Sequence, residues 1–305
     1  MTSLAITGAT GFVGSAVLNE ALAQGHGARA LARRDQPARE GVEWVRGDLA
    51  DAAALAGLVQ GADVVVHVAG LTNTPDPAEF DIANVTGTAN VIAAMAGVGV
   101  KRLVFVSSLA AREPKLSAYG ASKARAETLV EASGLDWTTV RPPAVYGPRD
   151  IDMLDLFRAA RWGVVPLPPG GATSIIHADD LAALLVELAT GNAAPTRKKV
   201  YEPDDGREGG WSHQELAQAI GRAMGRARVL APHLPRAVLD LAAAADRLAR
   251  GDRAKLTPDR VGYMCHPNWV SRFDRKPPPG LWQPKIAGEE GLRTTAEWYR
   301  REGWV

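Results

Sequence analysis

The sequence predicts an α/β protein with a Rossmann-like, doubly wound parallel sheet and a smaller, irregular C-terminal substrate lobe. Over the first two-thirds of the chain, short β-branched or apolar runs alternate with longer alanine-rich helical patterns. This alternation is typical of a parallel sheet with helices on both faces. The strand runs are almost continuously apolar, as expected for strands covered on both sides. A glycine-rich turn follows the first run, at the end of a strand where such sheets bind ligands.

The expected strands and helices alternate along the first part of the chain. Strands are expected at residues 3–7, 28–32, 43–46, 64–68, 102–107 and 137–141. The helices between them are expected near residues 13–24, 51–59, 84–97 and 118–133. This order allows each strand to be followed by a crossover helix and then by another parallel strand.

The pattern becomes irregular after about residue 142, where proline-rich loops replace the regular alternation. Further helices are expected near residues 180–190, 211–224 and 294–301. The second of these has Ser212 at its N-cap position and Glu215 three residues later, which is the spacing of a capping box. The expected domains are a Rossmann domain of residues 1–150 with a returning segment at about 173–200, and a lobe of residues 151–172 and 201–305.

Composition narrows the classes of partner. Thirty-five basic residues against 34 acidic ones leave no net field to attract nucleic acid or an anionic membrane, so a small-molecule ligand is expected. Cys265 is a single cysteine, and no cluster of Cys and His has zinc-like spacing, so neither a disulfide framework nor a metal site is expected. The sequence lacks a signal-peptide pattern and a membrane-spanning apolar run, which predicts a cytoplasmic protein.

The first turn predicts a pyrophosphate site. Gly8, Gly11 and Gly14 stand between the first expected strand and the first expected helix. In that position backbone N–H groups and the helix dipole can face a pyrophosphate. Further contacts are expected from the neighbouring residues Thr10, Phe12 and Val13.

Segments further along the chain resemble those of the extended short-chain dehydrogenases/reductases, and most closely their hydroxysteroid dehydrogenase-like and dihydroflavonol reductase-like members. The segments occur in the family's order: Gly47-Asp48-Leu49, His67-Val68-Ala69-Gly70, Asn84-Val85-Thr86-Gly87-Thr88, Ser107-Ser108, Tyr119-Gly120-Ala121-Ser122-Lys123, Arg141 to Pro148, and His177 to Leu181. The resemblance implies a nicotinamide cofactor, and it implies contacts with that cofactor from Asp48, Leu49, Val68, Ala69, Gly70, Pro142 and Val145. It also allows a homodimer, because two helices of this fold often form the interface in relatives.

The end of the second strand favours NADP(H) over NAD(H), although NAD(H) remains possible. Arg33 and Arg34 stand where NAD-binding proteins usually have an acidic side chain, and Asp35 comes only after them. A guanidinium suits a 2′-phosphate, whereas a carboxylate suits a ribose hydroxyl. The alternative is that both arginines are ordinary solvated charges.

Tyr119 and Lys123 are four residues apart on an expected helix, so their side chains lie on one face. A neighbouring ammonium favours the phenolate and lowers the pKa of a tyrosine, which lets Tyr119 exchange a proton with a carbonyl or alcohol. Ser107 or Ser108 could bind the reacting oxygen, and the resemblance favours Ser108. Leu109 stands where many sugar-nucleotide members have a third serine or threonine, so the choice between the two serines stays open. Asn84 is expected either to support the cofactor site or to cap a helix.

These residues together predict hydride transfer between the nicotinamide and a ketone or secondary alcohol. Residues 172–176 read Ala-Thr-Ser-Ile-Ile where sugar-nucleotide members carry an Arg-Asp-aromatic segment, and residues 162–168 are apolar. Both features favour an apolar substrate. A nucleotide-sugar epimerase or dehydratase is the first alternative, and a non-catalytic NADP(H)-binding sensor or structural subunit is the second.

Overall fold

A parallel sheet with strand order β10-β6-β5-β4-β1-β2-β3 forms the centre of the regular part of the chain. The computed structural model describes residues 1–305, apart from the side chain at position 253. The strands of this sheet are β1 (Ser3–Thr7), β2 (Gly27–Ala32), β3 (Val42–Arg46), β4 (Val64–His67), β5 (Arg102–Val106), β6 (Asp136–Val140) and β10 (Lys199–Tyr201). The predicted fold class is therefore confirmed, and β10 is an additional strand.

The strand order places the glycine-rich turn at the switch point of the sheet. β1 pairs with β2 on one side and with β4 on the other, so the chain reverses its direction of winding beside β1. Crossover helices then leave the carboxyl ends of these two neighbours in opposite directions, which opens a crevice for a ligand. The turn after β1 lies at this crevice.

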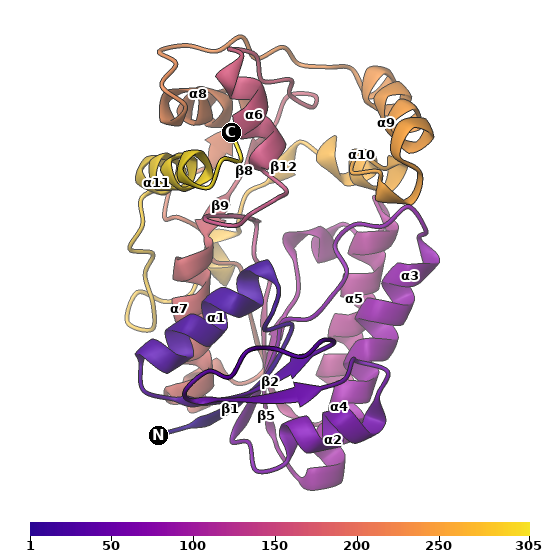
Figure 1. Cartoon of the computed structure of the whole chain (residues 1–305), viewed down its shortest axis with the longest axis vertical. Helices are drawn as coiled ribbons and strands as arrows, with labels where there is room; N and C mark the ends of the chain where they lie inside the picture. Colours follow the sequence, from indigo (N-terminus) through magenta and orange to yellow (C-terminus); the bar gives the residue numbers. More distant parts are fainter. The chain divides into compact units, whose positions relative to one another are not determined.

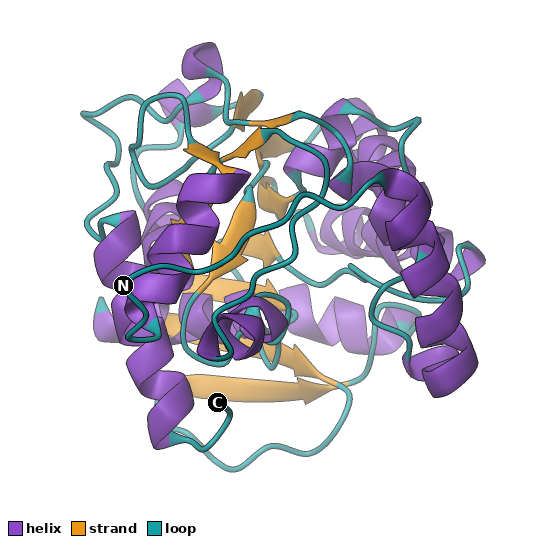
Figure 2. Cartoon of the chain, turned by 90° about the horizontal axis from the view of Figure 1, so that it is seen from above, coloured by secondary structure: helices purple, strands orange, loops and turns teal.

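Helices cover both faces of the sheet, as Figures 1 and 2 show. The helices of this part are α1 (Phe12–Ala23), α2 (Ala52–Val59), α3 (Ala78–Phe80), α4 (Gly87–Val98), α5 (Ala118–Ala132) and α7 (Ala178–Thr190), with a π-helix η1 (Asp81–Thr86) and 3-10 turns η2 (Leu109–Arg112) and η3 (Ala194–Thr196). Apolar side chains of α2, α4 and α5 form one core with β4 and β5, in which Leu58, Met95 and Phe105 are fully buried.

The remaining part of the chain is less regular. Its strands are β7 (Ala144–Tyr146), β8 (Ala172–Thr173), β9 (Ile175–His177), β11 (Trp211–Ser212) and β12 (Asn268–Trp269). Its helices are α6 (Leu154–Arg161), α8 (His213–Ala223), α9 (Arg236–Arg250), η4 (Gly251–Arg253), α10 (Pro258–Met264), η5 (Phe273–Arg275) and α11 (Gly288–Arg301). The capping box at Ser212 and Glu215 is present as predicted. The core of this part includes Phe157 and Tyr299, whose rings meet edge to face at 5.1 Å.

The last helix is longer than the sequence predicts, because it begins at Gly288 rather than near Thr294. Glycine disfavours a helix interior, so the local pattern hid the first turns. Close packing explains the glycines: a Cβ on Gly288 would lie 2.6 Å from a ring carbon of Trp211, and one on Gly291 would lie 2.3 Å from the hydroxyl of Tyr146. Tertiary contacts therefore override propensity at this point.

The chain divides into two compact units. The first comprises residues 1–141 and 181–201, and the second comprises residues 142–180 and 202–305. The first unit contains the parallel sheet and the glycine-rich turn. The second contains the short strands and the helices α6 and α8 to α11.

Candidate cofactor and catalytic site

The turn after β1 brings the backbone unusually close to its neighbours. Gly8 has a φ of +75°, in the left-handed region that favours glycine, and a Cβ there would lie 2.8 Å from the amide nitrogen of Ala69. A Cβ on Gly14 would lie 2.0 Å from the carbonyl oxygen of Gly8. Gly11 is the N-cap of α1 and offers no side chain to the helix amides. The turn therefore fits a pyrophosphate at the helix N-terminus. The other predicted contacts lie in this turn or at the start of α1: Thr10, Phe12 and Val13.

A buried chain of hydrogen bonds connects the end of β1, just before this turn, to β4 and α4. The Thr7 hydroxyl accepts from the amide of Ala69 at 3.1 Å and lies 2.7 Å from Nδ1 of His67. Nε2 of His67 lies 3.0 Å from the hydroxyl of Thr88, which donates to the carbonyl of Asn84 at 2.6 Å. Because Thr88 uses its hydrogen on Asn84, Nε2 of His67 must donate and Nδ1 must accept. Burial lowers the pKa of His67 to about 3, so its ring stays neutral within this chain of hydrogen bonds.

Asn84 joins the loop after β4 to the helix that carries the tyrosine. Its amide oxygen accepts from the backbone nitrogen of Leu71 at 2.7 Å, and its amide nitrogen donates to Ser122 Oγ at 2.9 Å. A Cβ on Gly70 would lie 2.9 Å from the Asn84 oxygen, so the loop passes directly over it. Asn84 lies within the π-helix η1 and is the N-cap of neither η1 nor α4, so the capping role is not observed, and its support of a cofactor site stays a prediction. Such π-helical turns are frequent at functional sites.

Lys123 holds its ammonium group at the carboxyl end of β5. Nζ donates to the carbonyl oxygen of Val106 at 2.8 Å, and a Cβ on Gly70 would lie 3.6 Å away from it. Tyr119 is one helical turn earlier on α5, with 9% of its surface exposed. Burial lowers the pKa of Lys123 to about 8, and the opposing effect of Glu127 is smaller. Lys123 therefore lies at the carboxyl end of β5, and Tyr119 is one turn away on the same helix.

Glu127 is a residue of this helix that the sequence did not single out. Its carboxylate accepts two hydrogen bonds from the guanidinium of Arg141, at 2.9 and 2.6 Å. Glu127 follows Lys123 by four residues, so its charge favours the ammonium form of that lysine. The spacing of four residues from Lys123 could have pointed to Glu127. Its partner Arg141 follows β6, so no local pattern predicts this ion pair.

Ser107 and Ser108 follow β5 directly and have different surroundings. Ser107 is 5% exposed, and its Oγ has no hydrogen-bond partner among the side chains that the structure describes. Ser108 is half-buried, and its Oγ accepts from the amide of Ala110 at 3.2 Å. A hydroxyl that accepts one bond can still donate its hydrogen. Ser108 can therefore donate to a reacting oxygen, and the buried Ser107 hydroxyl fits a polar group of a bound ligand.

The contact of the two arginines after β2 with a 2′-phosphate stays a prediction. Arg33 and Arg34 are exposed, and neither forms an ion pair with a carboxylate among the described residues. The neighbouring Asp35 is paired with Arg46 at 3.3 Å. Asp48, a predicted cofactor contact, is exposed, and its carboxylate accepts a hydrogen bond from the amide of Ala50. The remaining residue of that pair is Leu49, whose side chain packs against Gly87.

Two predicted cofactor contacts belong to the second unit. Pro142 is buried at its start, and Val145 lies on β7, where it pairs with Ile176 of β9. Their contact with a nicotinamide stays a prediction, as do the roles of Val68 and Ala69 beside Gly70. His177 is buried, and its ring meets that of Tyr146 edge to face with the ring centres 5.4 Å apart.

Comparison with known proteins identifies the class. Residues 8–191 match the model of a family described as NAD(P)H-binding. The chain is 35% identical to a ceramide reductase of Caulobacter vibrioides, over 99% of this chain and 96% of the relative. It is 31% identical to a 2-alkyl-3-oxoalkanoate reductase of Stenotrophomonas maltophilia, over 94% and 96%. The Thermus thermophilus UDP-glucose 4-epimerase in complex with NAD has a similar fold, with a TM-score of 0.69 at 23% identity over 98% and 99% of the two chains.

The chain belongs to the NAD(P)H-binding family and is an NAD(P)-dependent oxidoreductase of the extended short-chain dehydrogenase/reductase type. The two reductases named above are matched over nearly their whole length.

Proposed function

We propose that this protein uses NADPH to reduce a ketone on a long-chain, lipid-like molecule. The observation that carries the proposal is the placement of Lys123, whose ammonium is bonded to Val106 immediately before Ser107 and Ser108 and one turn from Tyr119. The names of the Caulobacter and Stenotrophomonas reductases support the substrate class, because one names a ceramide and the other a 3-oxoalkanoate with an alkyl branch. The apolar segment at residues 162–168 adds no support, because Val165 and Leu167 pack in the core and Trp162 faces solvent.

The reaction follows from the hydrogen bonds that these side chains can make. NADPH, when bound, supplies a hydride to the carbonyl carbon. Tyr119 gives its proton to the carbonyl oxygen, so the C=O bond becomes an alcohol while NADPH is oxidised to NADP⁺. Ser108 donates a hydrogen bond to the same oxygen as negative charge develops on it. The positive charge of Lys123 would stabilise the phenolate that Tyr119 becomes, and its ammonium would hold the ribose next to the nicotinamide.

The direct test is NADPH consumption with a panel of ketones. We expect a long-chain 3-oxo amide or a 2-alkyl-3-oxoalkanoate to be converted to its alcohol, with one NADPH oxidised for each alcohol formed. Turnover of a UDP-sugar without net change in the cofactor would instead identify an epimerase. NADPH binding that is unchanged in Tyr119→Phe, with no turnover of any compound, would identify a sensor.

Replacing Arg33 and Arg34 with alanine tests the preference for NADPH. Each guanidinium is expected to form charge-assisted hydrogen bonds with the 2′-phosphate, so the double variant should bind NADPH about a hundredfold more weakly. NADH lacks this phosphate, and its affinity should change little. Titration of both cofactors measures the difference, with Lys199→Ala, an exposed lysine on β10, as the matched control. Equal losses for NADPH and NADH would contradict the assignment.

The pH dependence of reduction should report Lys123. Its pKa of about 8 lies below the ordinary value, so the ammonium is present below pH 8 and is lost as the pH rises through that value. We expect kcat/KM to decline over the same range. Arginine stays charged, so Lys123→Arg should move the decline to higher pH even if its maximal rate is lower. An identical pH profile in both proteins would rule Lys123 out as the titrating group.

A further inference from the structure

Two extended segments of the second unit lie side by side and expose apolar side chains. The amide of Val165 donates to the carbonyl of Leu230 at 2.8 Å, and the amide of Leu230 donates to the carbonyl of Gly163 at 2.8 Å. Trp162 is 80% exposed, Leu230 is 67% exposed, and Val164, the bridge partner of Leu230, is 39% exposed. Their alternate neighbours point into the core, since Val165 is fully buried. The exposed side chains therefore share one surface.

The longer stretches of chain that contain these two segments have basic but no acidic side chains, and three of their six arginines pair with carboxylates outside them. Residues 156–178 and 216–239 contain no aspartate or glutamate, although the whole chain has nearly equal numbers of basic and acidic residues. Their arginines are Arg158, Arg161, Arg222, Arg226, Arg228 and Arg236. Among the described residues, Arg161, Arg226 and Arg228 form no ion pair with a carboxylate. We call the group formed by Arg161, Trp162, Val164, Arg226, Arg228 and Leu230 the Trp162 surface.

Arg226 is fixed beside the exposed tryptophan. Its guanidinium donates to the carbonyl oxygen of Arg161 at 3.1 and 2.6 Å, and the guanidinium of Arg161 lies 6.0 Å from the Trp162 ring. Basic and apolar groups are thus interleaved on the Trp162 surface. An exposed tryptophan with basic side chains beside it is typical of proteins that meet the headgroup region of a membrane.

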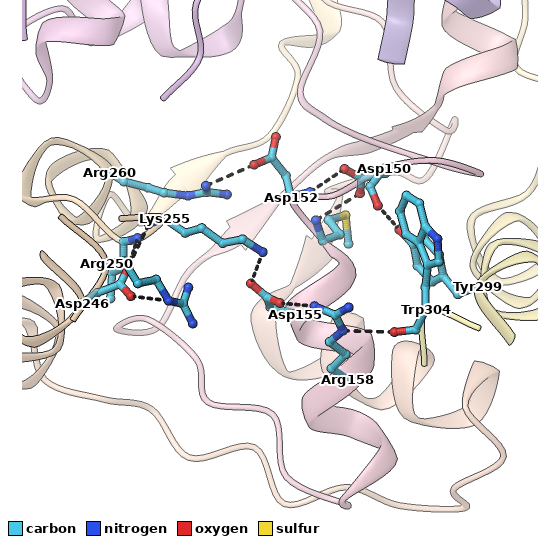
Figure 3. Close-up of polar contacts among 12 residues, drawn as sticks. Asp150, Asp152, Asp155, Arg158, Asp246, Arg250, Lys255, Arg260, Tyr299 and Trp304 are labelled. Atoms are coloured by element: carbon cyan, nitrogen blue, oxygen red, sulfur yellow. Dashed lines mark hydrogen bonds and ion pairs between the residues drawn. The ribbon is translucent and has the colours of Figure 1, made fainter. Parts of the chain in front are cut away.

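Helix α9, which follows directly in the chain, also turns apolar side chains to solvent. Val238, Leu241 and Leu248 are 45%, 72% and 90% exposed, and their spacing places them on one side of the helix. Two ion pairs tie the segment after α9 to the region of α6, as Figure 3 shows: Lys255 with Asp155 at 3.0 Å, and Arg260 with Asp152 at 3.1 Å. This apolar stripe is therefore held within the same unit as the Trp162 surface.

We propose that the Trp162 surface docks the protein onto a bilayer that contains anionic lipids. Trp162 and Leu230 would enter the headgroup boundary, while Arg226 and Arg228 would contact lipid phosphates. A second copy of this chain fits the surface less well, because it would bring these unpaired arginines face to face. No helix in the described part of the chain is long and apolar enough to cross a membrane, so the contact would be peripheral. The net charge of the whole chain did not predict this contact, because the basic and acidic side chains are unevenly distributed over the surface.

Co-sedimentation with vesicles tests this proposal without any turnover, so its outcome is separate from that of the proposed reduction. We expect the full chain to bind vesicles of phosphatidylcholine and phosphatidylglycerol, and to bind phosphatidylcholine alone much more weakly. The double variant Arg226→Gln/Arg228→Gln should bind anionic vesicles about 30-fold more weakly, from about 1 kcal/mol for each basic side chain near the surface. The variant Trp162→Ser/Leu230→Ser should also lose binding while retaining its melting temperature.

Matched controls distinguish binding by the Trp162 surface from a general effect of positive charge or of exposed apolar side chains. Lys101→Gln/Lys199→Gln removes two exposed lysines of the first unit, and Phe273→Ser removes a 92% exposed aromatic of the second unit. Both controls should bind vesicles as the unaltered protein does. Absence of binding to anionic vesicles, or equal losses in the controls, would overturn the proposal. So would a dimer in light scattering that Trp162→Ser/Leu230→Ser converts to a monomer, because the surface would then join two copies.

Discussion

Replacing Tyr119 with phenylalanine is expected to lower kcat for ketone reduction by about a hundredfold or more, because the variant has no proton to give to the carbonyl oxygen. The ring itself is retained, and so is its contact with Phe80, whose centroid lies 5.7 Å away. NADPH affinity should therefore change little. Steady-state kinetics with the best substrate of the ketone panel, together with an NADPH titration, measures both quantities.

The matched control is Tyr201→Phe, which makes the same chemical change on β10. Tyr201 is buried at the edge of the sheet, and no role in the reaction is proposed for it. Its kcat should stay within about twofold of the unaltered enzyme, as for most substitutions away from a reacting group. If Tyr119→Phe kept the full kcat, Tyr119 would not be the proton donor.

Gly14→Ala is expected to weaken NADPH binding at least about tenfold, because the added methyl group cannot be accommodated where the helix begins. A Cβ at this position would lie 2.0 Å from the carbonyl oxygen of Gly8 and 2.5 Å from its carbonyl carbon. These are backbone atoms, so the start of α1 would have to move away from β1. The pyrophosphate site depends on that approach. Cofactor titration measures the loss.

A second helical glycine provides the control for Gly14→Ala. Gly57 lies in α2, and a Cβ there would meet nothing within 4 Å. Gly57→Ala should raise the free energy of unfolding by up to about 1 kcal/mol, because alanine favours a helix, and it should leave NADPH affinity unchanged. Equal cofactor affinity in Gly14→Ala and Gly57→Ala would show that the turn does not bind the pyrophosphate.

Much of the first unit could be predicted because its local signals agree with its tertiary structure. Each of the six predicted strands lies within one residue of its position in the structure, since apolar runs such as Val64–His67 are buried on both faces. The seventh strand, Lys199–Tyr201, was missed. It has only three residues and pairs with β6, whose last residue precedes Lys199 by 59 positions. A run this short has no period of its own to detect.

The site was predictable in its residue types but not in its contacts. The four-residue spacing predicted that Tyr119 and Lys123 share one face of a helix. The glycine pattern predicted the turn after β1. The bond from Lys123 to the carbonyl of Val106 depends on how α5 packs against β5, which no local pattern encodes. The chain from Thr7 through His67 to Thr88 likewise joins three separate segments.

Helix α9 was missed for a different reason. Its buried side is narrow, with Leu239 and Ala243 as its buried residues, whereas larger apolar residues such as Leu248 face solvent. Periodicity predicts which side of a helix is apolar, but it assumes that the apolar side faces the core. The net charge of the whole chain likewise could not predict the basic Trp162 surface, because it averages over surfaces of opposite sign.

The order in which the chain visits its two units has a consequence for its synthesis. The chain leaves the first unit after Arg141 and returns only at Leu181, and β10 then covers the open edge of β6. Until the ribosome has added that returning segment, β6 presents an unpaired strand edge, which is a template for aggregation. Completion of the sheet must therefore wait for a long-range contact, and long-range contacts form slowly. A nascent chain that is stalled within residues 142–180 would be the form most in need of a chaperone.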